Sequence, residues 1–257
     1  MARSINSAHI SFGLVTIPVK LYTASSSDDV HFSMITPDGN KVRQQYVDAN
    51  TGEEVDRDAC LKGFECAKGE YVTFTAAELA SLQTSKSKIM SVAEFVSLSS
   101  VDLLQVEKSY YLGPDKGGAK GYLLLAKALK ESRQAAVAQW APRGKEQLMV
   151  IREYRGGLII HQMFYSTEVR NFEEVLKDVS ETVVSDIEVD MAKQLIKQLS
   201  KRKFSPEAYR DTYGDRVRDA VKAKVAGKDI TTTSEAPAET VMDLMAAIKM
   251  SLQTPTP

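Results

Sequence analysis

Short runs of apolar residues separated by turn residues dominate the first two thirds of the chain. Between residues 9 and 165 these runs are rich in Val, Ile, Phe, Tyr and Thr, a composition typical of β-strands. The pattern predicts strands at 9–15, 17–22, 30–35, 41–47, 71–75, 88–96, 109–112, 135–140, 147–153 and 158–164. A turn at Pro37-Asp38-Gly39-Asn40 predicts that the third and fourth form a hairpin. Strands this short and this numerous indicate a barrel or a sandwich.

The apolar pattern becomes helical in two regions. Residues 119–131 carry the cluster Tyr122-Leu123-Leu124-Leu125 and predict a largely buried helix that packs on the barrel. After residue 170, apolar residues recur every four positions, first over 187–199 and then over 209–225. The second of these helices is predicted to start at Ser205-Pro206-Glu207, an N-cap followed by proline at the first helical position.

The pattern divides the chain into a β core (1–170), a helical arm (171–226), a linker (227–238) and a final helix (239–257). The linker is polar and rich in turn residues, which indicates flexibility. One apolar stripe marks the final helix: Val241, Leu244, Met245, Ile248 and Leu252. A helix of about 15 residues is marginal by itself, so it needs a surface on its own domain or on another protein.

Charge is distributed unevenly although the formal net charge is only −1. Residues 84–170 hold 13 Lys and Arg against 8 Asp and Glu, and residues 193–228 hold 11 against 4. Residues 28–58 are acidic instead, with 3 Lys and Arg against 8 Asp and Glu. Because the local field decides which surface meets a polyanion, the basic regions are either solvated faces or a polyanion-binding surface.

Composition and the N-terminal sequence exclude several classes of protein. Cys60 and Cys66 are too few for a disulfide framework and have no nearby histidine to complete a zinc site, so we expect a reduced compartment and no cofactor. The first residues lack a basic segment followed by an apolar one, and no apolar run reaches 18 residues. We therefore expect a cytoplasmic protein that contacts no membrane.

Motifs that would indicate catalysis are incomplete. The loop 113–121 is rich in glycine, but its lysine does not directly follow the second glycine of a phosphate-binding loop. Ser85-Lys86-Ser87-Lys88 matches the start of a serine acylase motif without its companion motifs. The histidines His9, His31 and His161 are isolated in sequence. Binding is then the simplest activity, and an enzyme is the weakest of the hypotheses.

Trp140, the sole tryptophan, lies beside Pro142 and Arg143 and allows two interpretations. It either packs in the core or stacks on a nucleic-acid base.

The segment 11–22, Ser-Phe-Gly-Leu-Val-Thr-Ile-Pro-Val-Lys-Leu-Tyr, closely resembles the opening of the bacterial Ku family. The resemblance continues in the family's order through Gly52-Glu53-Glu54-Val55, Lys62-Gly63-Phe64-Glu65, residues 110–118, Arg143-Gly144-Lys145-Glu146 and residues 241–249. It covers nearly the whole chain. Asn6 and Ala8 stand where the family typically has Trp and Gly, so we expect different packing near the N-terminus. The family's lysine-rich extension after the final helix is also missing, so we expect no DNA contact from a tail.

The resemblance to Ku implies a mainly β fold with α-helices and a homodimer whose barrels and bridging strands close a ring around duplex DNA. Such a ring binds double-stranded DNA ends without sequence preference in repair by non-homologous end joining, because contacts to phosphate and sugar carry no sequence information. The resemblance also implies a non-catalytic, nucleoid-associated protein that recruits and stimulates DNA ligase D. The alternative is a β-barrel protein-interaction module without end specificity, in which the helix 241–253 recognises the partner.

Basic residues on strands or glycine-rich turns are the candidate DNA contacts: Lys20, Arg43, Lys88, Lys116, Lys120, Arg143, Lys145 and Arg152. Lys116 and Lys120 also flank the predicted start of a helix, where free N–H groups favour a phosphate. The candidate ligase contacts are the apolar residues of the final helix: Val241, Leu244, Met245, Ile248 and Leu252.

Overall fold

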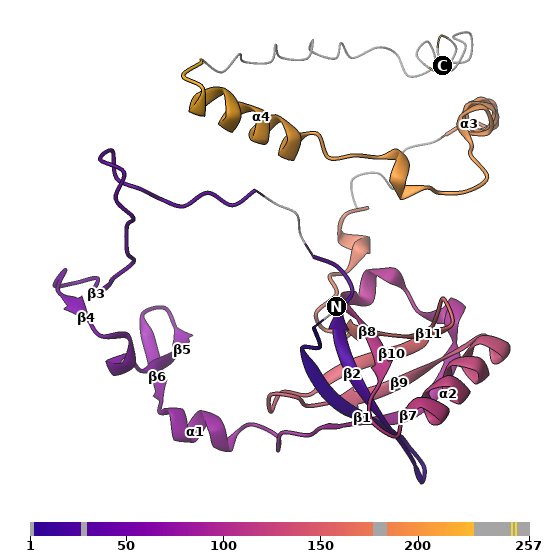
Figure 1. Cartoon of the computed structure of the whole chain (residues 1–257), viewed down its shortest axis with the longest axis horizontal. Helices are drawn as coiled ribbons and strands as arrows, with labels where there is room; N and C mark the ends of the chain where they lie inside the picture. The colour runs from indigo at the N-terminus through magenta and orange to yellow at the C-terminus, as the bar shows by residue number, and fades with distance from the viewer. Residues whose placement is uncertain (1–2, 27–29, 177–183, 229–247, 249, 251–257) are drawn as a thin grey trace. The chain divides into compact units, whose positions relative to one another are not determined.

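The chain divides into two units in the computed structural model, which describes residues 3–26, 30–176, 184–228, 248 and 250 (Figure 1). The first unit comprises residues 1–27 and 33–170 and contains a β-barrel and an extended arm. The second comprises residues 28–32 and 171–257 and contains two longer helices.

Seven strands of the first unit close into a barrel (Figure 1). Their hydrogen-bonding order is β1 (Asn6–Phe12), β2 (Val15–Thr23), β8 (Val106–Pro114), β11 (Gly157–Met163), β10 (Gln147–Tyr154), β9 (Gln134–Trp140) and β7 (Ile89–Ser97). The β1–β7 pair is parallel and the other neighbours are antiparallel. The prediction of a mainly β fold with a barrel is confirmed.

Alternate residues of the strands fill the barrel. On β2, Ile17, Val19 and Leu21 are buried, whereas Lys20 and Tyr22 between and after them are only half-buried. This period of two is expected of a strand that has one face in the core. The strand pattern therefore separates two surfaces, a packed interior and an outer face that is free for other contacts.

The first hairpin turns at Gly13 and Leu14, and this corrects the predicted strand boundary at Val15. Gly13 adopts a φ of +56°, which glycine reaches at little cost because it has no Cβ. Phe12 therefore pairs directly with Val15. The alternation of polar and apolar residues continues through such a tight turn, so the pattern alone did not locate it.

Helix α2 (Ala119–Ser132) covers one end of the barrel and buries Tyr122, Leu125 and Leu129 in the barrel core. The Tyr122 hydroxyl donates to the Leu112 carbonyl at 2.6 Å and accepts from the Leu158 N–H at 2.8 Å. One buried phenol thus ties the helix to β8 and β11. The predicted helix at 119–131 is confirmed, but the prediction that it is largely buried is wrong. Leu123 and Leu124 of its apolar cluster are 59% and 68% exposed, because only one face of the helix packs on the barrel.

The arm between β2 and β7 has no core of its own, since none of its residues 33–88 is buried. Its elements are β3 (Tyr46–Val47), β4 (Glu54–Val55), β5 (Lys62–Ala67), β6 (Glu70–Phe74) and α1 (Ala76–Ser81). The four strands form two separate two-stranded sheets, β3–β4 and β5–β6. Because an isolated hairpin is marginal in water, the arm requires a further surface to stabilise it.

The hairpin predicted from 30–35 and 41–47 is wrong, and β5 was not among the predicted strands. Around the predicted turn only the single bridge between Ile35 and Lys41 forms. Phe32 and Met34 are 70% and 68% exposed, so these apolar side chains have no surface in the described chain on which a sheet could pack. Apolar composition alone was misleading there, because pairing requires burial of one face.

The second unit contains α3 (Asp186–Leu199), which confirms the first predicted helix, and α4 (Tyr213–Val225). Ser185 and Glu188 form a capping box at the start of α3. Helix α4 begins at Tyr213, so the predicted start at Ser205 is wrong. The Ser205 hydroxyl donates to Glu207 and caps no backbone N–H, and only a short 3₁₀ turn (Pro206–Ala208) follows it.

Most of the predicted linker and final helix lies outside the described residues. Val241, Leu244, Met245 and Leu252 belong to that part of the chain. Ile248 is described, and it is helical and half-buried.

Candidate nucleic-acid interface

The outer face of β2, β8, β11 and β10 carries a row of large side chains, whose member on β11, Ile159, is only 6% exposed. Tyr22 pairs with Tyr111, Tyr111 with Ile159, and Ile159 with Arg152, so one register line crosses all four strands. Lys20 and Tyr154 lie on the same outer face, two residues further along their strands. We call this surface the tyrosine–arginine face; it comprises Lys20, Tyr22, Tyr111, Arg152, Tyr154 and the adjoining turn residue Arg155.

Tyr154 is the centre of the tyrosine–arginine face. Its ring stacks on that of Tyr111, with centroids 6.0 Å apart and an interplanar angle of 19°. The guanidinium carbons of Arg152 and Arg155 lie 5.5 and 5.2 Å from the Tyr154 centroid. Both distances are within the range of cation–π attraction, so the aromatic ring holds two cations at the surface.

A buried histidine fixes the orientation of Arg152. The Arg152 Nε donates to His161 Nε2 at 2.9 Å, and the Ser109 hydroxyl lies 2.7 Å from His161 Nδ1. Burial, and then the charge of Arg152, lower the pKa of His161 to about 4. The ring is therefore neutral near pH 7, where its Nε2 can accept the hydrogen bond from Arg152.

The Ser109–His161 pair resembles a nucleophile with its base, but its hydrogen bonds assign another role. Because His161 Nε2 accepts from Arg152, the proton of the neutral ring lies on Nδ1 and is donated to Ser109. His161 then has no free nitrogen with which to accept the proton of Ser109. His161 therefore positions Arg152 and does not act as a general base for Ser109.

The cations of the tyrosine–arginine face differ in how far their charge is compensated. Lys20 forms an ion pair with Asp115 at 3.1 Å. The pKa of Asp115 is lowered, first by the Lys116 backbone N–H and then by the hydrogen bond from Lys20. Arg152 and Arg155 form no ion pair with any residue in the described part of the chain. The uncompensated positive charge is therefore that of the two arginines.

The structure brings together two of the eight predicted DNA contacts, Lys20 and Arg152, on one face. Lys116 and Lys120 are exposed at the start of α2, where the Asp115 carboxylate already accepts from the Lys116 N–H. That carboxylate does not cap the helix itself, because α2 begins at Ala119 and its N-cap, Gly118, forms no side-chain cap hydrogen bond. A phosphate at this helix start therefore stays a prediction. Lys88 is exposed just before β7, and Arg43 is exposed in the arm.

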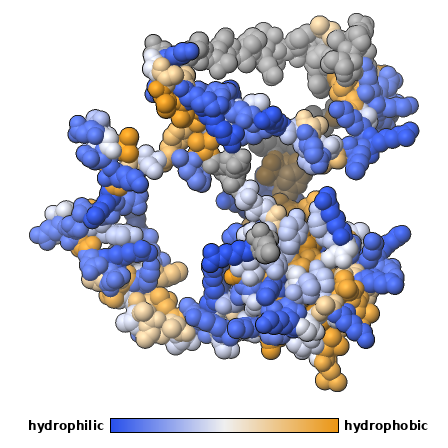
Figure 2. All heavy atoms as spheres, viewed as in Figure 1, coloured by the Kyte–Doolittle hydropathy of each residue, from blue (hydrophilic) through white to orange (hydrophobic). Residues whose placement is uncertain are grey.

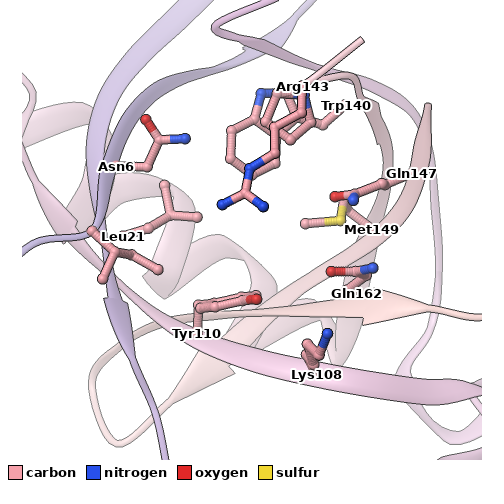
Figure 3. A pocket seen from close by; sticks show the side chains of 11 residues that line it. Asn6, Leu21, Lys108, Tyr110, Trp140, Arg143, Gln147, Met149 and Gln162 are labelled. Carbon is pink, nitrogen blue, oxygen red and sulfur yellow. The ribbon is translucent and has the colours of Figure 1, made fainter. Parts of the chain in front are cut away.

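The remaining two predicted contacts, Arg143 and Lys145, lie in the loop between β9 and β10. The Arg143 side chain reaches into an open cavity at the end of the barrel opposite α2 (Figure 3). Trp140 forms part of the cavity wall but is only 5% exposed, and its indole N–H donates to the Ser87 carbonyl at 2.9 Å. Of the two interpretations of this tryptophan, core packing is confirmed.

Sequence reasoning missed four members of the tyrosine–arginine face: Tyr22, Tyr111, Tyr154 and Arg155. The first three occupy outward positions of strands, a signal that was visible only once the strand register was known. Arg155 has a φ of 50° in the two-residue turn between β10 and β11, where Asn or Gly is usual. The one signal in the sequence itself was an arginine before Gly156, in the short turn between two predicted strands.

No group of three or more histidine, cysteine or acidic side chains with the spacing of a metal site occurs among the described residues. Within the same residues, no helix is both long and apolar enough to cross a membrane.

The fold and the site together define a class: a closed seven-stranded barrel with a capping helix, a coreless arm and a basic, aromatic outer face. Residues 11–191 match the family model described as the Ku70/Ku80 beta-barrel domain. The chain belongs to the Ku family.

Curated relatives agree with this assignment. A protein of Paraburkholderia phymatum is 40% identical over 98% of this chain and 83% of its own length. Proteins of Archaeoglobus fulgidus and Bacillus subtilis are 33% and 34% identical, each over 95% of this chain and over 96% and 79% of their own lengths. All three are named "Non-homologous end joining protein Ku". The resemblance noted from the sequence blocks is confirmed.

Proposed function

We propose that the chain binds double-stranded DNA ends without sequence preference, as a ring-shaped homodimer that acts in non-homologous end joining. The observation that carries the proposal is the tyrosine–arginine face. Its two uncompensated guanidinium groups suit phosphates, because the planar fork of an arginine matches two phosphate oxygens. The row that crosses the four strands contains no asparagine or glutamine, the side chains that most often read adenine edges. Such a surface favours contact with the backbone of any sequence.

The homodimer and the ring are supported by the arm. Its described residues bury no side chain, yet Phe64, Tyr71 and Leu61 are each more than 60% exposed. Large apolar side chains in a segment without a core indicate a protein–protein interface. A second copy of the chain is the partner that the family assignment favours, and two arms would complete a ring that only a DNA end can enter.

The recruitment of DNA ligase D is the finer part of the proposal. It is supported by the apolar stripe from Val241 to Leu252, a pattern suited to a groove on another protein. Leu244→Asp should weaken ligase recruitment in a pull-down with purified ligase D while DNA-end binding remains. Loss of DNA binding in this variant would contradict a separate role for the final helix.

The experiment that tests the main proposal compares linear and covalently closed circular duplexes of the same sequence in mobility shifts. We expect binding to the linear form alone, and occupancy that rises with fragment length as further rings thread on. The affinity should fall with salt, with a log–log slope of about −0.9 per phosphate contacted. Equal affinity for both forms would contradict a ring, and a flat salt response would contradict phosphate contacts.

A second function is favoured by an apolar groove between α2 and the first hairpin. Phe12, Phe95 and Leu124 line it, and its volume is about 500 Å³. Leu14 at the tip of the hairpin is fully exposed, and apolar surface is visible on this side of the barrel (Figure 2). A groove of this kind fits a protein-interaction module. A protein partner retained in a pull-down after nuclease treatment, by a chain that shows no preference for linear DNA, would establish that function instead.

A further inference from the structure

The open end of the barrel, opposite α2, contains a cavity of about 210 Å³ that we call the mouth cavity (Figure 3). Strands β1, β2, β8, β9, β10 and β11 all contribute to its wall. The buried side chains of Leu21 and Met149 form apolar parts of the wall, and the aromatic rings of Trp140 and Tyr110 flank it. A concave site with an apolar lining and a few polar groups is the usual form of a small-ligand site.

The polar groups in the mouth cavity have unused hydrogen-bonding capacity. The Arg143 guanidinium points into the cavity (Figure 3) and makes no hydrogen bond or ion pair within the described part of the chain. The Tyr110 hydroxyl and the Gln147 amide also have no described partner. The Asn6 amide accepts from the Ser7 N–H through Oδ1, and its NH₂ group remains free. Four side chains from four parts of the barrel thus present donors to one space.

The charge of the mouth cavity favours an anion. None of its lining residues carries a carboxylate. Lys108 at its edge is compensated by Glu107 at 3.2 Å, and the Gln162 amide also donates to Glu107. Arg143 is therefore the lining cation without compensation. A guanidinium fork among neutral amides is suited to the oxygens of a phosphate.

We propose that the mouth cavity binds a single nucleoside monophosphate unit. The phosphate would bind Arg143, and the base would lie against the half-buried ring of Tyr110, within reach of the Asn6 and Gln147 amides. Aromatic rings accept the face of any base, and carboxamides bond to base edges. The volume is below the range of about 300–1,000 Å³ usual for larger ligands, so a dinucleotide or a nucleoside triphosphate is too large.

A nucleoside monophosphate unit could come from two sources: a free mononucleotide or an unpaired terminal nucleotide of a DNA end. Only the second source rests on the proposed function. The chain provides a direct reporter, because Trp140 is its sole tryptophan and forms part of the cavity wall. Its fluorescence therefore reports on the mouth cavity alone.

The first test titrates the full chain with deoxyadenosine 5′-monophosphate, deoxyadenosine and inorganic phosphate, with fluorescence excited at the red edge of tryptophan absorption. We expect a saturable change for the monophosphate at concentrations at least tenfold lower than for the other two. Arg143→Gln should weaken this binding at least tenfold, and Arg143→Lys should weaken it less. The matched control is Lys127→Gln on α2, an exposed cation paired with Glu131, which should bind as the wild type does.

An unsaturable signal, or equal binding by Arg143→Gln and wild type, would overturn the proposal. Inorganic phosphate binding as tightly as the monophosphate would overturn the part assigned to the base. If Arg143→Gln lost its fold, circular dichroism would reveal it, and Gln147→Leu, which keeps the charge, should still weaken binding of the monophosphate.

The second test distinguishes the sources with linear duplexes that end either blunt or in one unpaired, 5′-phosphorylated nucleotide. A preference for the unpaired end that Arg143→Gln abolishes assigns the cavity to DNA ends. Monophosphate binding without such a preference assigns it to the free nucleotide. If linear and closed circular DNA bind alike, the proposed function fails while the fluorescence result for the cavity stands.

Discussion

The barrel and the arm are built on opposite principles, although they are consecutive in one chain. The barrel closes all its sheet edges and buries residues such as Ile151, Ile160 and Met149 completely. The arm buries no described residue and exposes Phe64 at 67% and Met34 at 68%. The barrel therefore has a core of its own, whereas the described residues of the arm have none.

Because the barrel has a core and the arm has none, we expect the barrel to bind with a preorganised surface and the arm to be ordered by binding. A rigid barrel holds Arg152 and Tyr154 in fixed geometry, so the tyrosine–arginine face is organised before any ligand arrives and loses little entropy on binding. For the arm, which has no buried residue of its own, we expect a partner to add order, and part of the interaction energy would then be spent on ordering it. The proposed ring, which would admit a DNA end and then hold it, needs both properties.

The largest effect is expected from the barrel core. Ile151→Ala removes part of a fully buried side chain from β10 and should lower the free energy of unfolding by about 2–5 kcal/mol. The matched change in the arm, Ile35→Ala at a residue 59% exposed, should alter it by less than about 0.5 kcal/mol. Urea denaturation at equal, low protein concentration measures both. Similar losses in the two variants would contradict the contrast between barrel and arm.

The second effect is a pH dependence of stability that arises from His161 in the barrel. The pKa of His161 falls from 6.5 to about 4 on folding, so the unfolded chain binds more protons in the window between these values. Stability from the neutral ring is complete above pH 6.5 and is lost as the pH falls toward 4. The slope should reach at most about 1.4 kcal/mol per pH unit.

The measurement is urea denaturation of wild type and His161→Gln between pH 4 and 7. Because the carboxylates titrate alike in both proteins, the difference between the two slopes isolates His161. His161→Gln should be less stable at pH 7 and less sensitive to pH over this window. Parallel curves would show that the ring is not held neutral beside Arg152.

How far the sequence determines the structure also differs between the two regions. In the barrel, alternation located all seven strands, and the apolar cluster around Leu125 located α2, because one buried face constrains every second residue. In the arm the same reasoning predicted a hairpin around Asn40 that forms only one bridge, and it missed β5. Those residues have no buried face in the described chain, so their apolar pattern does not constrain which strands pair.

The candidate site was only partly predictable for a related reason. Basic residues are recognisable in a sequence, and Lys20 and Arg152 were identified in this way. Their setting depends on strand register, which places Tyr111 beside Tyr154 and His161 behind Arg152. The compensation of Lys20 by Asp115 likewise comes from packing of the loop before α2 against β2, two segments nearly a hundred residues apart.

The third effect concerns the arm and its proposed partner. Phe64→Asp on β5 places a charge on an exposed apolar surface and should raise the dimer dissociation constant at least about tenfold, since truncating a central apolar contact typically costs more than 1 kcal/mol. Sedimentation velocity over a concentration series measures it. Leu123→Asp, a similarly exposed residue on α2, is the control and should leave the dimer intact. The reverse result would place the dimer contact on the barrel.

The smallest effect is expected from one turn of the barrel, where a single substitution should raise stability and weaken DNA binding. Arg155 adopts a φ of 50° in a two-residue turn that favours Asn followed by Gly, and Gly156 already follows it. Arg155→Asn should therefore stabilise the chain by up to about 1 kcal/mol, a rise of about 2–4 °C in Tm. The same change removes one uncompensated cation from the tyrosine–arginine face. It should weaken binding to linear duplex and reduce the log–log salt slope by about 1. A variant that is more stable and binds DNA with an unchanged salt slope would show that Arg155 contacts no phosphate, and the strained turn would then lack a functional reason.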